Sequence, residues 1–439
     1  MSAKKTTKSS KGTRKSGDPA APKGMRDITG EEYYLFQGFF EKAQEIAMYY
    51  GFKPIETPVL EHEDIFTSGI GEGTDIVDKE MYTLRTKGGD HLALRPEYTA
   101  GIMRSYIENG MGSQPQPLFF YTYGPTFRHD NPQKGRYRQF YQFDMEAIGS
   151  DKSIVDALVI KTMLTIIIES GAPSPSIDLN SIGCKECRPH YIRELTSYYK
   201  KHLNALPSID RERLKTNPLR ILDSKEEKTI ELNAGAPESV SFLCPTCKKH
   251  FKEVLEHLEE MAIPYSINKN LVRGLSYYSR TVFEVIVDMG EGNPPLTIAG
   301  GGRYDYLAKQ LGSKKDVPGI GCALGVDRII SMPWYTKHLP RIMKKPKVYF
   351  IQLGIEAKLK SLNVIEILRK AHVPIAQALS KDSLGAQLAM AEKSGAPYTI
   401  IFGQKEAIEQ TVIVRNMETR SQETVKHVKL AEYMKGLNK

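Results

Sequence analysis

The sequence predicts an α+β protein, in which an antiparallel β-sheet flanked by helices is interrupted by an inserted segment and followed by a C-terminal α/β module. Residues 118–148 contain two long strand-like runs around the loop NPQKG, the pattern of an antiparallel hairpin. Strand-like and helix-like segments then alternate from residue 347 to the end, which is typical of an α/β unit. The 439 residues are enough for two or three domains, each with its own core.

Residues 1–22 form a basic tail that we expect to be disordered, because Lys, Ser, Thr, Gly and Pro dominate it. Most of the formal net charge of +9 lies here, so net charge is poor evidence that the folded part binds nucleic acid. The tail is either a solvated arm or a weak RNA-contacting arm. It lacks the apolar region of a secretory signal, and no apolar run is long enough to span a membrane. We therefore expect a cytoplasmic protein with no membrane partner.

The first predicted elements are a helix and an extended segment. Residues 31–50 carry apolar side chains at helical spacing. In the following FKPIETPVL, Pro54 and Pro58 remove backbone donors, so this segment belongs at a sheet edge or an interface. Residues 91–110 predict a short strand, a turn and a helix, and residues 152–170 predict a strongly apolar helix.

The second strand of the hairpin has one aromatic and one polar face. In YRQFYQFDMEAIG, aromatic residues and Met145 alternate with Gln142, Asp144 and Glu146. Gln142 and Glu146 point to the same side, about 13 Å apart. This polar face is either the floor of a pocket or a solvated outer surface, and the residues alone favour neither.

Further strands are predicted at residues 276–289 and 295–302, followed by a strand and a helix within PGIGCALGVDRIISM. Before them, residues 183–262 are richer in charge and are bracketed by CKEC and CPTC. After them, the proline-punctuated residues 336–346 read as a linker.

Four arginines suggest an anion site. Arg128, Arg136 and Arg273 lie at strand ends or turns. Arg328 falls in the first turn of a predicted helix, where a cation opposes the helix dipole unless an anion, or Asp327, compensates it. Each arginine alone also has an ordinary structural explanation. Together with carboxylates able to take a cationic or imidazole group, they suit a polyphosphate and a small zwitterion. The sequence contains no P-loop, and neither HExxH nor a Ser/His/Asp order indicates a hydrolase.

With these motifs in order, the chain resembles the class II histidyl-tRNA synthetases. FRHDNPQKGRYRQFYQFDMEAIG resembles motif 2 of that class, GIGCALGVDRII resembles motif 3, and the first helix with FKPIETPVL resembles the dimer-forming motif 1. LVRGLSYYSRTVFE and GGRYD resemble the signatures of histidyl enzymes, and LALRPEYTAG resembles their amino-acid loop.

The resemblance implies an ATP-dependent ligase that activates L-histidine to histidyl-adenylate and transfers it to tRNA(His), with ATP and Mg²⁺ bound and a homodimeric assembly. The implied domains are a class II antiparallel catalytic domain in two parts, residues 23–182 and 263–335. They also include an insertion at 183–262, the linker, and an anticodon-binding domain at 347–439.

The resemblance also implies residue roles. Arg128 and Arg273 would be catalytic at the α-phosphate, and Arg128 would contact the histidine carboxylate. Arg128, Arg136 and Arg328 would bind ATP. The implied histidine-binding residues are Glu97, Thr99, Arg128, Gln142, Glu146, Arg273, Tyr277, Tyr278 and Tyr304.

Within that histidine-binding set, Glu97, Thr99 and Gln142 would take the α-amino group, and Glu146 with Tyr278 would take the imidazole.

Three residues depart from the family pattern. Ser276 stands where aspartate is usual in LVRGLSYY, Asp327 where glutamate is usual, and Tyr98 where a small residue is common. We expect Ser276 to tune local packing or polarity without loss of function.

The cysteines suggest a metal site. Cys184 and Cys187 form one CxxC pair and Cys244 and Cys247 a second, so a structural zinc site is plausible, with four reduced thiols as the alternative. The family does not require this metal. We expect Cys322 to be a buried core residue.

Two other functions are open to the same sequence. A non-catalytic relative, such as the regulatory subunit of ATP phosphoribosyltransferase, usually loses the catalytic arginine or the C-terminal module, both of which are present here. If the chain were a nucleic-acid-binding protein without enzymatic activity, the presence of all the pocket residues would be a coincidence.

Overall fold

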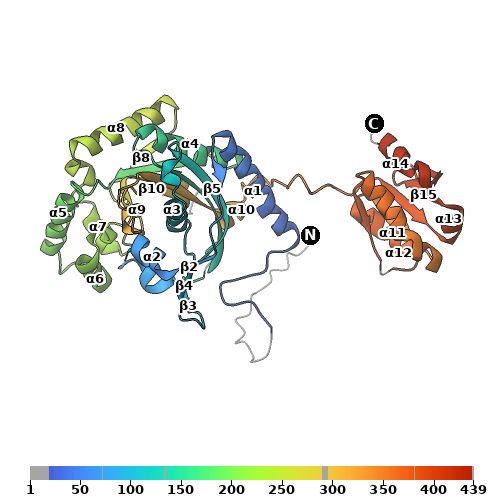
Figure 1. Ribbon diagram of the computed structural model, residues 1–439, viewed down its shortest axis with the longest axis horizontal. Coiled ribbons are helices and arrows are strands. Elements are labelled where there is room, and N and C mark those ends of the chain that lie inside the picture. Colours follow the sequence, from blue (N-terminus) through green and yellow to red (C-terminus); the bar gives the residue numbers. More distant parts are fainter. Residues whose placement is uncertain (1–18, 72, 133–134, 289–294, 380, 438–439) are drawn as a thin grey trace, which may run out of the picture. The chain divides into compact units, whose positions relative to one another are not determined.

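The computed structural model describes residues 19–71, 73–132, 135–288, 295–379 and 381–437. Most of the predicted tail, residues 1–18, and residues 133–134 of the hairpin loop lie outside this description. The chain divides into two compact units, with the boundary between Pro340 and Arg341 (Figure 1). This boundary lies within the predicted linker, where residues 336–346 form no helix or strand.

The first unit is built on an eight-stranded sheet with the order β1-β5-β6-β11-β10-β9-β7-β8. Its strands from β5 to β7 pair antiparallel, and only the two edge pairs, β1 with β5 and β7 with β8, are parallel among the described residues. The strands are β1 Lys53–Pro54, β5 Leu118–Phe127, β6 Gln139–Ile148, β7 Ser176–Ser181, β8 Tyr265–Ile267, β9 Ser279–Val287, β10 Leu296–Arg303 and β11 Gly319–Gly325.

The predicted hairpin and edge segment are confirmed. β5 and β6 pair along their whole length, and β1 lies at the sheet edge beside β5. Pro54 has no backbone N–H to donate. Because β1 lies at the sheet edge, no hydrogen bond to a second neighbouring strand is lost.

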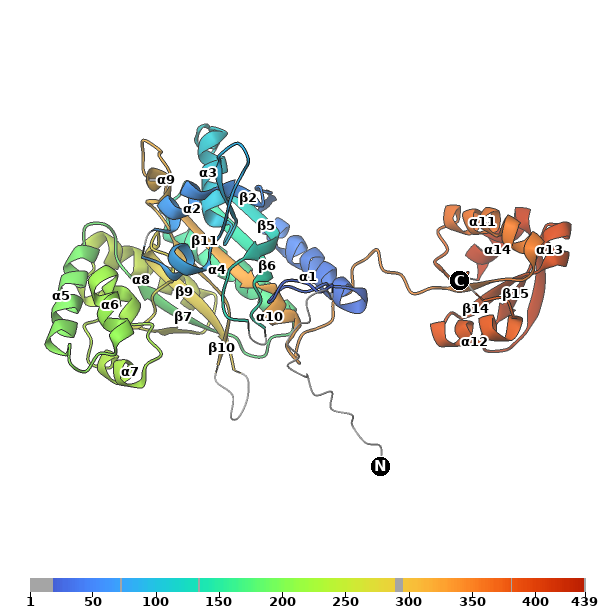
Figure 2. The ribbon, with the colours of Figure 1, turned by 90° about the horizontal axis from the view of Figure 1, so that it is seen from below.

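One face of this sheet is apolar because alternate strand residues point to it. Phe143 and Met145 of β6 pack there against three helices, α1 Gly30–Tyr49, α4 Ser153–Glu169 and α8 Pro245–Glu260. Phe143 stacks on Tyr121 of the neighbouring strand, with ring centroids 5.7 Å apart. The view from below in Figure 2 shows β6, β9, β10 and β11 running side by side as one twisted layer.

The opposite, polar face is partly covered by a smaller subassembly. It contains a three-stranded sheet of β2 Leu60–His62, β4 His91–Leu94 and β3 Tyr82–Arg85, in that order. Around it lie α2 Glu63–Ile70, a π-helical turn η1 Ile76–Glu80, α3 Thr99–Glu108, the 3₁₀ turn η2 Met111–Ser113 and α9 Leu307–Gln310.

Arg95 and Tyr98 join this subassembly to the hairpin. The buried Arg95 guanidinium donates to the carbonyls of Pro125 (3.0 Å) and Thr57 (2.8 Å). The ring of Tyr98 lies 4.2 Å from the Arg95 guanidinium carbon, so the large residue at position 98 stacks on a buried cation.

The residues between β7 and β8 are helical. They form α5 Arg188–Lys201, α6 Ser208–Thr216, α7 Glu227–Asn233, α8 and the 3₁₀ turns η3 Pro218–Ile221 and η4 Ser239–Phe242. Beyond β11, α10 Val326–Ile330 begins at once, as the sequence predicted for GVDRII.

The second unit has a five-stranded sheet with the order β13-β12-β14-β15-β16. β12 pairs parallel with β13 and β14, and the remaining pairs are antiparallel. Its elements are β12 Val348–Gln352, α11 Ile355–Lys370, β13 Ile375–Gln377, α12 Leu384–Ser394, β14 Tyr398–Phe402, α13 Gln404–Glu409, β15 Thr411–Asn416, β16 Gln422–Lys426 and α14 His427–Gly436. The predicted α/β module is confirmed. In the described part of the chain, no helix has the length and apolar character needed to cross a bilayer.

Candidate active site

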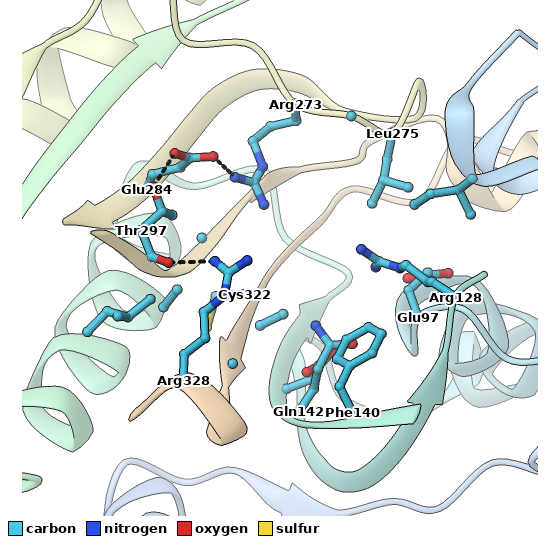
Figure 3. Close-up of a pocket in the computed structure, with 18 of the residues that line it drawn as sticks. Glu97, Arg128, Phe140, Gln142, Arg273, Leu275, Glu284, Thr297, Cys322 and Arg328 are labelled. Carbon is cyan, nitrogen blue, oxygen red and sulfur yellow. Dashed lines mark hydrogen bonds and ion pairs between the residues drawn. The ribbon is translucent and has the colours of Figure 1, made fainter. Parts of the chain in front are cut away.

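A cavity of about 520 Å³ opens on the polar face of the large sheet (Figure 3). Its volume is in the range of small-molecule binding sites, about 300–1,000 Å³. All but one of the predicted ATP- and histidine-binding residues line it, namely Glu97, Thr99, Arg128, Arg136, Gln142, Arg273, Tyr277, Tyr278, Tyr304 and Arg328. The polar face of β6 is therefore a pocket floor and not a solvated surface.

One end of the cavity is cationic. Burial lowers the pKa of Arg328, and repulsion from Arg136 and Arg128 lowers it further. Cations that repel one another in a cavity are stabilised when an anion binds among them. This end is therefore suited to a phosphate chain.

Each of these arginines is held by its local structure. Arg128 follows β5; its Nε donates to the Pro96 carbonyl at 2.9 Å, and its guanidinium lies 5.3 Å from the Phe140 ring centroid. Arg328 donates to the Thr297 carbonyl at 2.8 Å. Arg136 pairs with Asp130 at 2.8 Å, but its side chain is 42% exposed, so it is the most solvated of the three.

Arg273 enters from the loop before β9. It forms an ion pair with Glu284 of β9, whose other oxygen accepts from Thr297 at 3.1 Å. Burial would lower the pKa of Arg273, but its neighbours Tyr278 and Glu284 raise it above the ordinary value. Its Nε is buried without a hydrogen-bond partner among the described residues, and a bound acceptor would satisfy it.

The other end of the cavity is acidic and rich in hydroxyls. Glu97 precedes α3 and accepts from the backbone N–H groups of Thr99 (2.7 Å) and Ala100 (2.9 Å), and the Tyr277 hydroxyl donates to it at 3.3 Å. Burial raises the pKa of Glu97. This capping geometry fixes the carboxylate at the cavity wall.

Glu146 is the predicted site residue that the structure does not place on the cavity wall. It is 1% exposed and lies behind Thr99 and Tyr304, whose hydroxyls donate to its two carboxylate oxygens. Burial raises its pKa to about 8. Each carboxylate oxygen has two lone pairs. The oxygens of Glu146 can therefore each accept a further hydrogen bond besides the one from Thr99 or Tyr304.

Several lining residues were not singled out from the sequence, notably Asp144, Phe140, Glu284 and Thr297. Asp144 carried a signal, because it lies on the same strand face as Gln142 and Glu146. Gln142 Oε1 and Asp144 Oδ1 are buried without partners in the part of the chain that the structure describes. Two unpaired acceptors on the floor suit an ammonium group.

Ser276 lies outside the cavity lining. Its hydroxyl and its backbone N–H both donate to the Ile70 carbonyl at the end of α2, the N–H at 3.0 Å. The departure from the family's aspartate therefore falls at a packing contact, as expected.

Four cysteines form the second group that could hold a ligand. The sulfur atoms of Cys184, Cys187, Cys244 and Cys247 all lie within 4.8 Å of one another. Cys322, by contrast, is 3% exposed in β11, and its position in the core is as predicted.

These geometric features agree with the comparison to known proteins. The sequence profile described as histidyl-tRNA synthetase matches residues 24–329. This chain belongs to the histidyl-tRNA synthetase family. A profile described as an anticodon binding domain matches residues 347–437, which are almost the whole second unit.

Individual relatives of this synthetase family cover nearly the full chain. The histidine–tRNA ligase of Dehalococcoides mccartyi strain 195 is 42% identical over 405 residues, which are 92% of this chain and 96% of the relative. That of Acetivibrio thermocellus is 40% identical, with 92% and 96% covered.

Solved structures confirm the predicted fold. The apo histidyl-tRNA synthetase of S. aureus superposes with a TM-score of 0.78 at 30% identity, covering 95% of this chain and 100% of that one. A Bacillus halodurans protein described as an ATP phosphoribosyltransferase regulatory subunit/histidyl-tRNA synthetase has a TM-score of 0.60. It is 22% identical over 88% of this chain and 98% of its own, so it shows a shared fold alone.

Proposed function

We propose that this synthetase joins L-histidine to tRNA(His) at the expense of ATP. The observation that carries the proposal is one cavity with convergent arginines at one end and buried carboxylates and hydroxyls at the other. Such a cavity suits a triphosphate and an amino acid bound together, with the carboxylate of the amino acid facing a phosphorus atom of the triphosphate.

In the first step, a histidine carboxylate oxygen attacks the α-phosphorus of ATP, an O–P bond forms, and pyrophosphate leaves. Negative charge builds on the α-phosphate oxygens in the transition state, and fixed cations stabilise it. We assign this role to Arg128 and Arg273, which enter from opposite walls of the cavity. Arg136 and Arg328 would hold the outer phosphates. ATP would bind as its Mg²⁺ complex, with Glu284 offering an oxygen ligand on the wall.

In the second step, a hydroxyl of the terminal ribose of tRNA(His) attacks the carbonyl carbon of the adenylate. The ester forms, the bond to the phosphate oxygen breaks, and AMP leaves with the bond's electron pair, while the proton of the attacking hydroxyl passes to the leaving phosphate or to water. The C-terminal unit would bind the anticodon, in keeping with its matching profile.

Histidine would lie at the acidic end. Glu97, Thr99 and Gln142 would take its α-amino group, and the free acceptor on Gln142 supports this. The imidazole would contact Glu146, Tyr278 and Tyr304, with Tyr277 holding Glu97 in place. A site with buried polar groups rejects amino acids that leave those groups unpaired, so discrimination needs no second editing site.

We also propose a cytoplasmic homodimer. Large apolar side chains are exposed on α1 and β2, including Met48 (59%), Tyr49 (86%) and Leu60 (41%), and a second copy would cover them. All five cysteines are free thiols, which suits a reducing compartment. The domain boundaries proposed are those predicted, with the insertion at 183–262 between two parts of the catalytic domain.

A structural Zn²⁺ at the four cysteines belongs to the same proposal. Cys184 Sγ lies 3.7 Å from Cys187 Sγ and 3.9 Å from Cys244 Sγ. Four thiolates around one Zn²⁺ at about 2.3 Å would be about 3.8 Å apart, whereas a disulfide would need about 2.05 Å. The residues therefore fit a tetrahedral Cys₄ site.

The non-catalytic alternative is less well supported. It would leave the arginine cluster and the free acceptors of the floor without a ligand, and it would not explain the anticodon-binding profile. Aminoacylation of tRNA(His) with labelled histidine and ATP tests the proposal. Charging that depends on all three substrates supports it, and no charging by folded protein would reject it.

A further inference from the structure

The four-cysteine cluster joins both ends of the insertion to the main sheet. Cys184 and Cys187 lie in the short link between β7 and α5, and Cys244 and Cys247 lie at the start of α8. Gly183 precedes the cluster with φ of +74°, and a Cβ there would come within 2.7 Å of Cys187 Sγ. The backbone is thus cleared for the sulfur atoms to approach one another.

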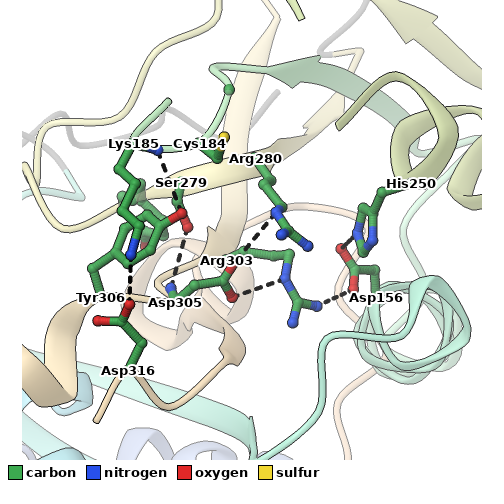
Figure 4. Close-up of polar contacts among 12 residues, drawn as sticks. Asp156, Cys184, Lys185, His250, Ser279, Arg280, Arg303, Asp305, Tyr306 and Asp316 are labelled. Atoms are coloured by element: carbon green, nitrogen blue, oxygen red, sulfur yellow. Dashed lines mark hydrogen bonds and ion pairs between the residues drawn. The ribbon is translucent and has the colours of Figure 1, made fainter. Parts of the chain in front are cut away.

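A first connection runs from the cluster to the segment after β10. The Tyr306 ring packs on the cysteines, and its hydroxyl accepts from the Lys185 N–H at 3.4 Å. Lys185 also lies 5.2 Å above the Tyr306 ring and pairs with Asp316 at 2.8 Å, as Figure 4 shows. Tyr306 is two residues from Tyr304, which lines the cavity and whose hydroxyl donates to Glu146 behind it.

A second connection is made by Arg188, which directly follows Cys187. Its half-buried guanidinium donates to the backbone carbonyls of Ile182, Gly183 and Tyr278. Tyr278 lines the cavity. A Zn²⁺ with four thiolates carries net negative charge, so a half-buried cation beside it is stabilised. Metal binding would therefore hold Arg188, and through it the backbone of Tyr278.

The end of β10 is anchored from the same side. Arg303 is fully buried and pairs with Asp156 of α4 and with Asp305, at 3.1 Å for the latter (Figure 4). The second oxygen of Asp156 contacts His250 at 3.1 Å, and His250 lies one turn after Cys247 on α8. Helix α8, which begins at the proposed ligands Cys244 and Cys247, is thus linked through His250 and Asp156 to Arg303, the residue before Tyr304.

We infer that the four-cysteine metal centre is a positioning element of the histidine subsite, acting through Tyr306 and Arg188 on Tyr304 and Tyr278. The inference rests on the proposed function. Arg128, Arg136 and Arg328 lie after β5, in the β5–β6 loop and on α10, and contact none of these residues in the interactions described above. Of the arginines assigned to the phosphates, Arg273 alone lies beside one of them, 5.7 Å from the Tyr278 ring centroid. Loss of metal should therefore weaken histidine binding far more than ATP binding.

The first test uses the full-length protein with its metal and after removal of the metal by a chelator under reducing conditions. Elemental analysis should give about one zinc per chain. Cobalt(II) added to the depleted protein should give thiolate charge-transfer bands. In ATP–pyrophosphate exchange, KM for histidine should rise about tenfold or more on depletion, because small displacements of positioning groups have large effects, while KM for ATP changes less than about twofold. Zinc added back should restore the original KM.

Single substitutions distinguish an effect of the metal centre on the histidine subsite from a general loss of folding. Cys247→Ser should abolish cobalt binding, whereas Cys322→Ser, which changes the cysteine outside the cluster, should keep it. Tyr306→Ala should retain zinc and the thermal unfolding midpoint of a folded protein but raise KM for histidine. Tyr265→Ala, which removes a tyrosine whose hydroxyl donates to Glu259 and which does not line the cavity, is the matched control and should leave KM unchanged.

The possible results are distinguishable. Protein that never binds zinc or cobalt at these cysteines would overturn the inference. So would metal removal, or Tyr306→Ala with metal bound, that leaves histidine affinity unchanged in calorimetry. If the metal-loaded protein bound no histidine at all, the proposed function would fail and the inference with it, while the metal analysis would still report on the cysteines.

Discussion

Arg273 lies so close to Gly300 that a Cβ on residue 300 would come within 2.7 Å of the guanidinium. The two belong to different segments, the loop before β9 and the middle of β10. The glycine of the GGG run thereby gives Arg273 its place beside Glu284 on the cavity wall. Glycine is needed at position 300 because the Arg273 guanidinium lies against it, and not because the strand itself requires glycine there.

Gly300→Ala should therefore displace Arg273 without unfolding the protein, because the group that must move is the end of a flexible side chain. We expect the rate of histidyl-adenylate formation to fall roughly tenfold or more, with a melting temperature close to wild type. Pre-steady-state pyrophosphate release measures this. Gly385→Ala in α12 is the matched control, since a Cβ there meets open space. Equal rates for both variants would contradict the proposed position of Arg273.

Arg328→Ala should act on ATP binding more than on chemistry. Arg328 is held by the Thr297 carbonyl at the cationic end, among arginines that repel it. Its removal relieves that repulsion in the free protein but takes one cation from the phosphate chain. We expect KM for ATP to rise about tenfold or more, with KM for histidine changed less than about threefold. Steady-state exchange kinetics at varied ATP test this, and a selective rise in KM for histidine would contradict the assignment.

Glu146 should make stability depend on pH. Burial raises its pKa from the ordinary 4.5 to about 8, so the folded state keeps the proton more tightly than the unfolded chain. Its contribution is fully present below the unfolded pKa and is lost as pH rises toward 8. Glu146→Gln should flatten this decline, so that the variant gains stability relative to wild type at alkaline pH. Urea midpoints at about pH 5.5 and about pH 9 measure it.

The same Glu146→Gln protein should bind histidine weakly above about pH 8, where the wild-type group is a carboxylate that can accept from both hydroxyls and the imidazole and an amide cannot. Thr162→Ala, which removes a helix-internal hydroxyl contact in α4, is a control for general loss of polarity. Parallel pH profiles for wild type and Glu146→Gln would show that this carboxyl does not titrate as its burial implies.

Ser276→Ala should affect stability and not catalysis. The hydroxyl donates to the Ile70 carbonyl and is outside the cavity lining. Losing one hydrogen bond of this kind costs about 1 kcal/mol in the free energy of unfolding. We expect kcat/KM for histidine to stay within about twofold of wild type. A large fall in kcat/KM, with stability unchanged, would place Ser276 in the site instead.

Much of the fold and part of the site could be predicted because they depend on local pattern. The alternation along residues 137–148 placed Gln142 on a polar face, and the strand-to-helix step at Gly325 placed Arg328 at a helix start. Both follow from backbone periodicity. The burial of that polar face did not follow, because it depends on α3 and the β9 loop, which are distant in sequence.

Contacts between distant segments were beyond single-sequence reasoning. The pairing of Arg273 with Glu284 depends on how a loop folds back on its own strand. The placement of Glu146 behind Thr99 and Tyr304 depends on three separate elements meeting. The closeness of the two CxxC pairs was suggested by the motifs themselves, but only the folded insertion brings their sulfur atoms together.

The most direct test of the central claim is histidine-dependent ATP–pyrophosphate exchange by wild-type protein and Arg273→Ala, side by side. The account predicts exchange that requires histidine, and a loss of roughly 10²–10³-fold in the variant while its fold and the proposed dimer are unchanged. No exchange by the folded wild-type protein, or exchange by Arg273→Ala near the wild-type rate, would contradict it.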